Sequence, residues 1–159
     1  HSISLAPVVN ESTEFSAAAI LNDELNKLMV AENVLDIVSL DIADSQLEVV
    51  ITSVTDRPYT VSLSKELGME EVDEWRLTVS TRVTWYDIKR DEILLEKRMT
   101  SWGVYVPGVD ISTDGLDNDG DNLIDSEDND EVGSPRESAM DISVRRLTED
   151  ILSEITNTW

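Results

Sequence analysis

The sequence has no cysteine and a single histidine, and these two shortages exclude much of the chemistry that proteins perform. Without cysteine the chain forms no disulfide, no thiolate metal site and no thiol nucleophile. The histidine is His1, so no internal Ser–His pair and no histidine-ligated metal site is available. The six glycines form neither a dinucleotide-binding fingerprint nor a phosphate-binding loop. The sequence therefore predicts a protein that is not an enzyme.

Basic residues are also scarce, since 12 Lys and Arg stand against 34 Asp and Glu and give a formal net charge of −22. A protein that binds nucleic acid neutralises phosphates with a basic surface, so this charge excludes nucleic acid as a partner. It argues equally against a basic patch that docks on anionic lipid. Nine of the acids lie within residues 114–131, which hold no basic residue. Without these nine negative charges, the other residues still carry a net charge of −22 + 9 = −13. The rest of the chain is therefore anionic in its own right.

Long apolar runs are absent as well. The longest is Ala17–Leu21, far below the roughly 20 residues of a membrane-spanning helix. No basic segment followed by an apolar stretch opens the chain, so we expect any export signal to be already absent. Apolar residues make up 40% and charged residues 29%, as in a globular protein. We expect one domain over residues 1–159.

The beginning of the chain predicts a strand followed by a helix. Residues 2–9 alternate apolar and polar side chains, and Pro7 places this strand at an edge or an end of a sheet. The segment NEST, residues 10–13, offers N-cap residues to a helix that ends near residue 32 or 33. The apolar stripe of this helix has spacings of three and four and consists of Ala18, Leu21, Leu25 and Leu28.

Several strands follow. Residues 34–40 predict a short strand, and QLEVVITSV, residues 46–54, predicts a longer one. TDRP, residues 55–58, reads as a turn, and YTVSL, residues 59–63, as a further short piece.

The clearest strand covers residues 74–87, and IKRDE turns the chain into a hairpin partner over residues 93–106. Its apolar face holds Leu77, Val79, Thr81, Val83 and Trp85. The opposite face is polar, and because it carries Arg76 and Arg82 it is the most cationic surface that the sequence predicts. Strict alternation of this kind indicates an antiparallel strand covered on one side only.

The last element is a helix with a marked start. Ser134 offers a cap, Pro135 suits the first helical position and Glu137 completes a capping box. Its apolar stripe consists of Met140, Val144, Leu147, Ile151 and Ile155, widened by Leu152 and Trp159. Two amphipathic helices and a one-sided sheet cover each other. The expected fold class is therefore α+β, a two-layer sandwich with two helices on one face of a mostly antiparallel sheet.

One acidic loop, within residues 109–133, has the spacing of a calcium site. Counted from Asp117, carboxylates fall at positions 1, 3, 5, 9 and 12, and position 7 offers a backbone carbonyl oxygen. Calcium takes six to eight oxygen ligands, and alternate spacing lets one tight loop direct successive side chains to one point. The predicted ligands of a single Ca²⁺ are Asp117, Asp119, Asp121, Leu123, Asp125 and Asp128.

This loop departs from the EF-hand pattern, because Asn122 replaces the usual glycine and Asp128 replaces the bidentate glutamate. The flanking segments do not look helical, so the loop resembles the helix-free calcium loops of thrombospondin type 3 and dockerin-like repeats. The alternative is a solvated acidic insertion that binds ions only diffusely.

With these elements placed, the sequence resembles the lipopolysaccharide-assembly lipoprotein family, LptE. The resemblance rests on four segments in order: PVVNES at 7–12, ADSQLEVVITSV at 43–54, DEWRLTVSTRVTWYD at 73–87 and the closing helix at 135–159. It covers nearly the whole chain apart from about residues 109–133.

The resemblance implies a function without catalysis. It implies two helices against one face of a mostly antiparallel sheet and a place at the periplasmic face of the outer membrane, with a lipid anchor on the full-length protein. It also implies a partner β-barrel, LptD, which such proteins plug while lipopolysaccharide passes to the cell surface. Lipopolysaccharide is a second candidate partner.

Two other hypotheses remain open. In one, the protein is a calcium-dependent binding or adhesion module, and its partner binding disappears with a chelator. In the other, it is an acidic hydrolase, whose activity requires one Asp or Glu outside residues 114–131.

Overall fold

The computed structural model describes residues 1–63, 70–108 and 134–158. The chain forms two compact units, and its longest strands and second helix contribute to both. Unit 1 consists of His1–Val54, Val79–Ser101 and Val144–Trp159, and unit 2 consists of Thr55–Thr78 and Trp102–Ser143. The single domain expected over residues 1–159, with an insertion at 109–133, stays a prediction.

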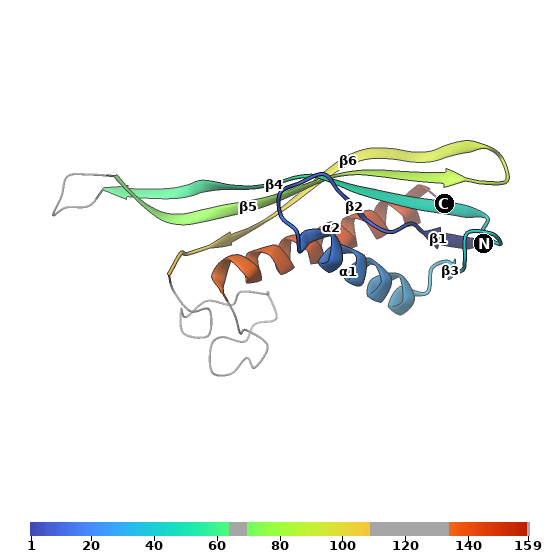
Figure 1. Ribbon diagram of the computed structural model, residues 1–159, viewed down its shortest axis with the longest axis horizontal. Helices are drawn as coiled ribbons and strands as arrows, with labels where there is room; N and C mark the ends of the chain where they lie inside the picture. The colour runs from blue at the N-terminus through green and yellow to red at the C-terminus, as the bar shows by residue number, and fades with distance from the viewer. Residues whose placement is uncertain (64–69, 109–133, 159) are drawn as a thin grey trace. The chain divides into compact units, whose positions relative to one another are not determined.

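Two helices and six strands are described (Figure 1). The helices are α1 (Ala17–Glu32) and α2 (Pro135–Thr158). The strands are β1 (Ser2–Leu5), β2 (Val9–Asn10), β3 (Asp36–Ile37), β4 (Ser45–Leu63), β5 (Glu70–Asp87) and β6 (Glu92–Tyr105). The strand order is β3-β1-β4-β5-β6, and β2 pairs with β4.

The expected fold class is confirmed, because two helices pack on a mixed, mostly antiparallel sheet. The parallel part lies at the N-terminal strands: β1 pairs in parallel with both β3 and β4, and β2 pairs in parallel with β4. Pro7 interrupts the predicted strand at residues 2–9 and leaves β1 and β2 as two short pieces along the same neighbour. A proline has no N–H for a ladder hydrogen bond, which explains the break.

The core of unit 1 lies between the sheet and the two helices, which Figure 1 shows on the same side of it. The sheet contributes alternate side chains, which in β5 are those of the predicted face from Val79 on, with Thr81 1% exposed and the others fully buried. Leu77 of the same face is fully buried in unit 2. From α2 the predicted stripe is buried in unit 1 from Val144 on, and its first member, Met140, is buried in unit 2. Leu152 lies at the margin of the stripe, and Trp159 is outside the described residues. The buried stripe of α1 consists of Ala17, Leu21, Leu25 and Met29, one position off the predicted Ala18 and Leu28 at its two ends.

The start of α1 differs from the prediction. The segment at residues 10–13 does not cap the helix but forms its own turn: Ser12 N–H donates to Asn10 Oδ1 over 3.0 Å, and Asn10 Nδ2 donates to the Glu14 carbonyl over 2.8 Å. The helix begins later, at Ala17. Asparagine and serine side chains compete with the helix for local backbone groups, so this turn delays it. The predicted end is confirmed, since Asn33 adopts the left-handed conformation, with φ of 47°, and its N–H donates to the Met29 carbonyl.

The predicted turn at residues 55–58 is wrong, because β4 continues through it to Leu63 and includes the predicted piece at 59–63. The pairing of β2 with β4 ends at Ile51. Beyond that point no described strand lies on that side of β4. Pro58 has no N–H to donate, and no described strand on that side needs a hydrogen bond from it. The strand predicted at residues 34–40 is reduced to the two residues of β3.

The remaining elements follow the sequence. The β5–β6 turn is held by Asp87, whose Oδ1 accepts hydrogen bonds from the N–H groups of Lys89 and Arg90, both over 2.9 Å. Helix α2 begins at Pro135, and the Glu137 N–H donates to the Ser134 hydroxyl over 3.3 Å, as the capping pattern predicts.

Candidate functional site

The candidate site is a stack of three side chains on the sheet of unit 2: Tyr59 from β4, Arg76 from β5 and Trp102 from β6. Strand β5 lies between the other two strands, and the Arg76 side chain contacts both aromatic rings, which also contact each other. Its guanidinium carbon lies 5.6 Å from the centroid of the Tyr59 ring and 5.5 Å from that of Trp102. The two rings are 5.9 Å apart and tilted by 36°. Both distances to the guanidinium are within the range of cation–π contacts, so this aromatic–arginine stack joins all three strands.

The alternation of the strands explains why the stack faces away from the core. Arg76 precedes the fully buried Leu77 in β5, and Trp102 lies between the buried Ser101 and Gly103 in β6. Successive side chains of a strand point to opposite faces. Arg76 and Trp102 therefore lie on the face opposite the buried one.

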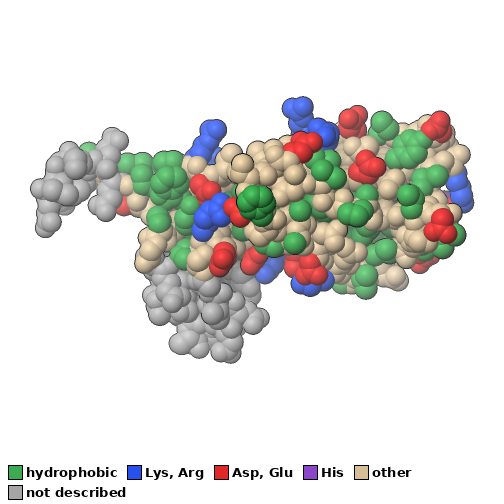
Figure 2. Space-filling view, in the orientation of Figure 1, with side chains coloured by type: hydrophobic (Ala, Val, Ile, Leu, Met, Phe, Trp, Pro, Cys, Tyr) green, Lys and Arg blue, Asp and Glu red, His purple; other side chains and the backbone are tan. Residues whose placement is uncertain are grey.

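The surroundings of the stack are exposed and apolar. Tyr59 is 47% exposed and Trp102 is 40% exposed. Further along β4, Val61 and Leu63 are 51% and 69% exposed. Figure 2 shows hydrophobic side chains gathered over this part of β4 and β5. An exposed apolar cluster around a charged group is typical of an interaction surface rather than of a solvated sheet face.

Arg76 and the described acidic residues near it on β5 do not pair with one another. Among the described residues, no carboxylate lies within ion-pairing distance of Arg76. Two acids of the same strand, Asp73 and Glu74, instead accept hydrogen bonds from the hydroxyl groups of Ser62 and Thr60, over 2.8 and 2.9 Å. In the part of the chain that the structure describes, Arg76 thus carries a positive charge with no anionic neighbour bound to it.

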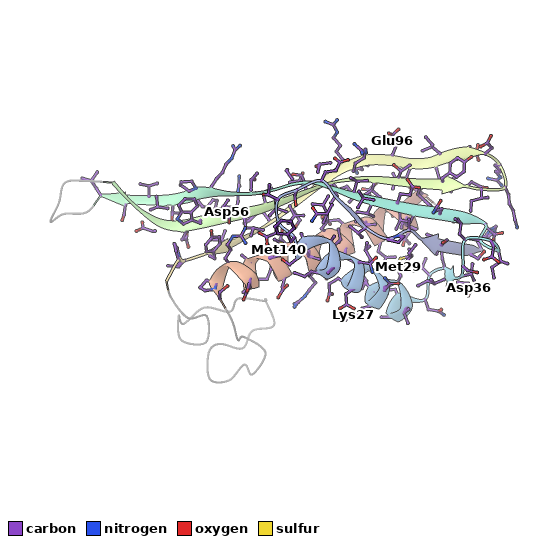
Figure 3. The ribbon with its side chains drawn as sticks, in the orientation of Figure 1. Lys27, Met29, Asp36, Asp56, Glu96 and Met140 are labelled. Atoms are coloured by element: carbon purple, nitrogen blue, oxygen red, sulfur yellow. The ribbon has the colours of Figure 1, made fainter. Side chains whose placement is uncertain are left out.

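A second cluster in unit 2 connects the start of α2 to the sheet. Asp56 of β4, labelled in Figure 3, binds Arg136 through two parallel contacts, Nη2 to Oδ2 over 2.9 Å and Nε to Oδ1 over 3.2 Å. The Tyr105 hydroxyl at the end of β6 also donates to Asp56 Oδ1, over 2.9 Å. Bidentate arginine–carboxylate pairs are geometrically specific. This cluster therefore fixes the first turn of α2 against two strands.

The Tyr105 hydroxyl provides a pH-dependent signature of this cluster. Burial, together with the hydrogen bond to Asp56 and its negative charge, raises the pKa of Tyr105 to about 12 from an ordinary value of 10.0. Because the folded pKa lies above the unfolded one, the associated stability is present below pH 10 and is lost as the pH rises through about 12. In a spectrophotometric titration we expect the difference between the wild type and Tyr105→Phe to show one phenol that ionises near pH 12. A difference curve centred near pH 10 would contradict the hydrogen bond.

Gly103 brings the backbone of β6 unusually close to α2. A Cβ at this position would lie 2.4 Å from the Ala139 carbonyl oxygen and 2.9 Å from its Cα. No side chain other than hydrogen fits there, because the neighbour is helix backbone. The helix therefore crosses β6 at a point that only glycine permits, one residue after Trp102.

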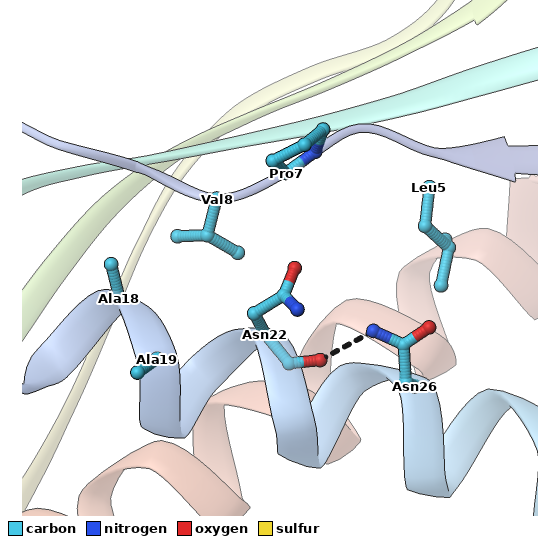
Figure 4. A pocket seen from close by; sticks show the side chains of 7 residues that line it. All are labelled: Leu5, Pro7, Val8, Ala18, Ala19, Asn22 and Asn26. Carbon is cyan, nitrogen blue, oxygen red and sulfur yellow. Dashed lines mark hydrogen bonds between the residues drawn. The ribbon is translucent and has the colours of Figure 1, made fainter.

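Unit 1 has a shallow groove between the chain that joins β1 to β2 and the outer face of α1 (Figure 4). Its volume is ≈ 390 Å³. Figure 4 shows the small side chains of Ala18 and Ala19 opposite Pro7 and Val8, with Asn26 donating to the Asn22 carbonyl over 2.6 Å. The described residues that line the groove include no charged side chain, so it lacks the convergent charged groups from which a reactive site is built.

At one end of the unit 1 sheet, Asp44 joins three segments. It binds the Lys89 ammonium group, its Oδ2 accepts from the Ser2 N–H over 2.9 Å, and its carbonyl accepts from the Ile88 N–H over 2.9 Å. The hydrogen bond from Lys89, followed by that from Ser2, lowers the pKa of Asp44 from 3.8 to about 2. Since the folded pKa is depressed, this stabilisation is present above pH 3.8 and is lost as the pH falls through about 2. The role of this cluster is to hold the first strand in place.

The predicted calcium ligands, Asp117, Asp119, Asp121, Leu123, Asp125 and Asp128, all lie outside the described residues. Within residues 1–63, 70–108 and 134–158 no group of three or more His, Asp or Glu side chains is arranged to hold a metal ion. In the same part of the chain, neither helix has the length and hydropathy to span a membrane. The sequence also did not point to the stack: Tyr59 follows the segment read as a turn, and no local pattern brings it to Trp102.

Comparison of the sequence with models of known protein families identifies the family of this chain. The lipopolysaccharide-assembly family model, LptE, matches residues 1–158. The chain belongs to the LptE family. This match confirms the resemblance read from the four sequence segments, while the calcium loop within it stays a prediction. Among curated proteins, none matches this sequence.

Solved structures share the LptE-type fold of this chain at low sequence identity. The hypothetical protein CT253 from Chlamydia trachomatis is 12% identical, with a TM-score of 0.61 over 97% of this chain and 94% of that one. Protein XCC0632 from Xanthomonas campestris is 10% identical, with a TM-score of 0.55 over 99% and 86%. The rare lipoprotein B from Shewanella oneidensis is 14% identical, with a TM-score of 0.53 over 99% and 96%. These likenesses concern the fold.

Proposed function

We propose that this protein is a non-enzymatic subunit that braces or plugs an outer-membrane β-barrel of the LptD type during lipopolysaccharide transport to the cell surface. The observation that carries the proposal is the match of the lipopolysaccharide-assembly family over residues 1–158. The exposed aromatic and aliphatic side chains on the sheet of unit 2 support it, because a brace needs a surface that a partner can cover. The absence of a histidine after His1 and of any cysteine agrees with a role that needs no catalytic group.

The same proposal places the protein at the periplasmic face of the outer membrane, held by a lipid on the full-length chain. Lipopolysaccharide is a second candidate partner. With a formal charge of −22, either direct binding of its phosphates is weak, or divalent ions bridge the two, or the glycolipid is a different one. Nucleic acid is not a partner in this proposal, for the same electrostatic reason.

Purification of the native, full-length protein in mild detergent tests the proposal. We expect an outer-membrane β-barrel to remain bound in stoichiometric amount, identified by mass spectrometry. The mass of the N-terminal peptide of the native protein should show an acylated cysteine upstream of Ser2. Recovery of the protein without any barrel would count heavily against the bracing function.

We also propose that one Ca²⁺ binds to Asp117, Asp119, Asp121, Asp125, Asp128 and the carbonyl oxygen of Leu123. The spacing of these residues within the acidic loop supports it. In a calorimetric titration at fixed ionic strength, we expect one saturable site that Asp119→Asn with Asp121→Asn weakens by at least tenfold, because two anionic ligands become neutral. The control, Asp114→Asn with Asp130→Asn, removes the same charge outside the twelve-residue loop and should change the affinity less than twofold. Equal losses in both double variants would indicate diffuse ion binding.

The calcium spacing favours one second candidate function, a calcium-dependent binding or adhesion module. A chelator separates it from the first. In the bracing function the barrel remains bound when calcium is removed, whereas in a calcium-dependent module partner binding disappears with the ion.

A further inference from the structure

We infer that the aromatic–arginine stack of Tyr59, Arg76 and Trp102 is the anchor of a protein–protein interface, and that it receives a carboxylate set among apolar side chains of the partner. The inference deepens the proposed function and rests on it for the identity of the partner, which is the wall of the β-barrel. It assigns the contact to one face of the sheet in unit 2.

The composition of the stack is the first argument. Tryptophan, tyrosine and arginine are the residues most enriched among the few that dominate interface energetics, and here one of each lies in mutual contact across three strands. Val61 and Leu63 extend the exposed apolar area beside them. Because the stack is built on strands, its geometry exists before the partner arrives, which lowers the ordering cost of binding.

The charge of Arg76 is the second argument. The two rings contact its guanidinium group, and in the described part of the chain no carboxylate pairs with it. A guanidinium has five N–H donors in a planar fork that matches a carboxylate. If a partner covered this face without an anion, the charge of Arg76 would be buried unpaired, at high cost. A carboxylate of the partner removes that cost and makes the contact specific.

The acidic residues near the stack favour a protein carboxylate over a lipid phosphate as the anion that binds Arg76. Asp73 and Glu74 precede Arg76 by three and two residues on the same strand, and both face the hydroxyl groups of β4. Of the two other described arginines of unit 2, Arg136 is already bound to Asp56, and Arg57 lies two residues before Tyr59 on β4 and is exposed. A phosphate with up to two negative charges would meet both acids, and of the two cations Arg76 and Arg57 only Arg76 is held in the stack. A single carboxylate with apolar neighbours meets less repulsion and fits the exposed aliphatic side chains.

The experiment measures how much barrel remains bound to full-length variants of the protein in mild detergent. Arg76→Glu reverses the charge at the stack, and Arg76→Lys keeps the charge but loses the planar fork. The control, Arg82→Glu, makes the same reversal six residues further along β5, where the arginine already has an acidic neighbour in Glu11 at 3.8 Å. We expect Arg76→Glu to reduce the bound barrel at least tenfold, Arg76→Lys at least threefold, and Arg82→Glu less than twofold.

Thermal unfolding of each isolated variant separates binding from folding, because a stack that only stiffens the sheet would change the unfolding temperature and leave the bound fraction of folded protein unchanged. A photoreactive residue at Val61 in the otherwise unchanged protein gives a measurement that does not depend on the arginine variants. We expect it to form a cross-link with the barrel.

The outcomes are distinguishable. If the wild type retains the barrel and both Arg76 variants retain it equally well, the inference is wrong and the bracing function stands. If the wild type retains no barrel, the bracing function and the inference fail together. A cross-link from Val61 to lipopolysaccharide alone would show that this face binds the lipid and would overturn the protein interface.

Discussion

Replacing Gly103 by alanine is expected to lower the free energy of unfolding by about 3 kcal/mol. The added Cβ would lie 2.4 Å from the carbonyl oxygen of Ala139, a distance that real Cβ atoms essentially never show. The neighbour is the backbone of α2 and not the end of a flexible side chain, so β6 and the helix must move apart. That movement would also disturb Trp102, the adjacent residue in the sequence and a member of the aromatic–arginine stack. Denaturant unfolding measures the change directly.

The neighbouring residue offers the matched control. Val104→Ile adds one carbon atom at the next position of the strand, where the side chain is half-buried, and should cost less than about 1 kcal/mol. An unfolding midpoint of Gly103→Ala equal to that of the wild type would show that the helix does not approach β6 as closely as described.

Replacing Trp85 by alanine is expected to cost about 4 kcal/mol, because it leaves the largest cavity that a single truncation of the core can create. Trp85 is the largest of the fully buried side chains and belongs to the alternating apolar face of β5. Its surroundings are strands and helices of unit 1, which cannot collapse into the space without losing their own contacts. Denaturant unfolding again gives the free energy, and the most blue-shifted part of the tryptophan emission should disappear.

Trp102→Ala is the control for this truncation. It removes the same side chain from the same sheet, but Trp102 is 40% exposed, so the expected cost is about 1 kcal/mol, most of it from the lost contacts with Arg76 and Tyr59. Equal costs for the two tryptophans would contradict the burial described for Trp85.

The glycine and tryptophan predictions also bear on the proposed interface. Trp102 contributes little to stability by this reasoning, so a large loss of partner binding in Trp102→Ala would reflect the missing contact and not an unfolded protein. Gly103→Ala would instead reduce binding through the fold. Comparison of the two variants at the temperature of the binding measurement therefore separates a contact residue from a residue that positions it.

Much of the fold is readable from local patterns. The alternation of β5 predicts both the strand and its buried face, because a side chain on a strand changes face at every residue. The serine before α2 and the proline at its first position predict where the helix begins, because they satisfy or omit backbone donors that every helix start leaves free. The four segments typical of the LptE family predict the family to which the chain belongs.

Other features depend on neighbours that no local pattern contains. Pro58 looks like part of a turn, and only the end of the β2–β4 pairing at Ile51 shows that a proline can remain within β4. The segment at residues 10–13 looks like a helix cap, yet its side chains close their own turn. The sequence spacing of the acidic loop predicts calcium ligands at residues 117–128, and this prediction awaits the titration.

From the sequence alone followed the α+β class, the faces of the principal strand and helices, the family, and a net charge that argues against nucleic acid as a partner. These properties depend on periodicity, capping and summed charge, which are read along the chain. Only the tertiary structure showed that Tyr59, Arg76 and Trp102 form one stack and that Gly103 touches the helix backbone. The physical reason is that strand order and helix crossing bring together residues from distant parts of the chain, and such contacts leave no period in the sequence.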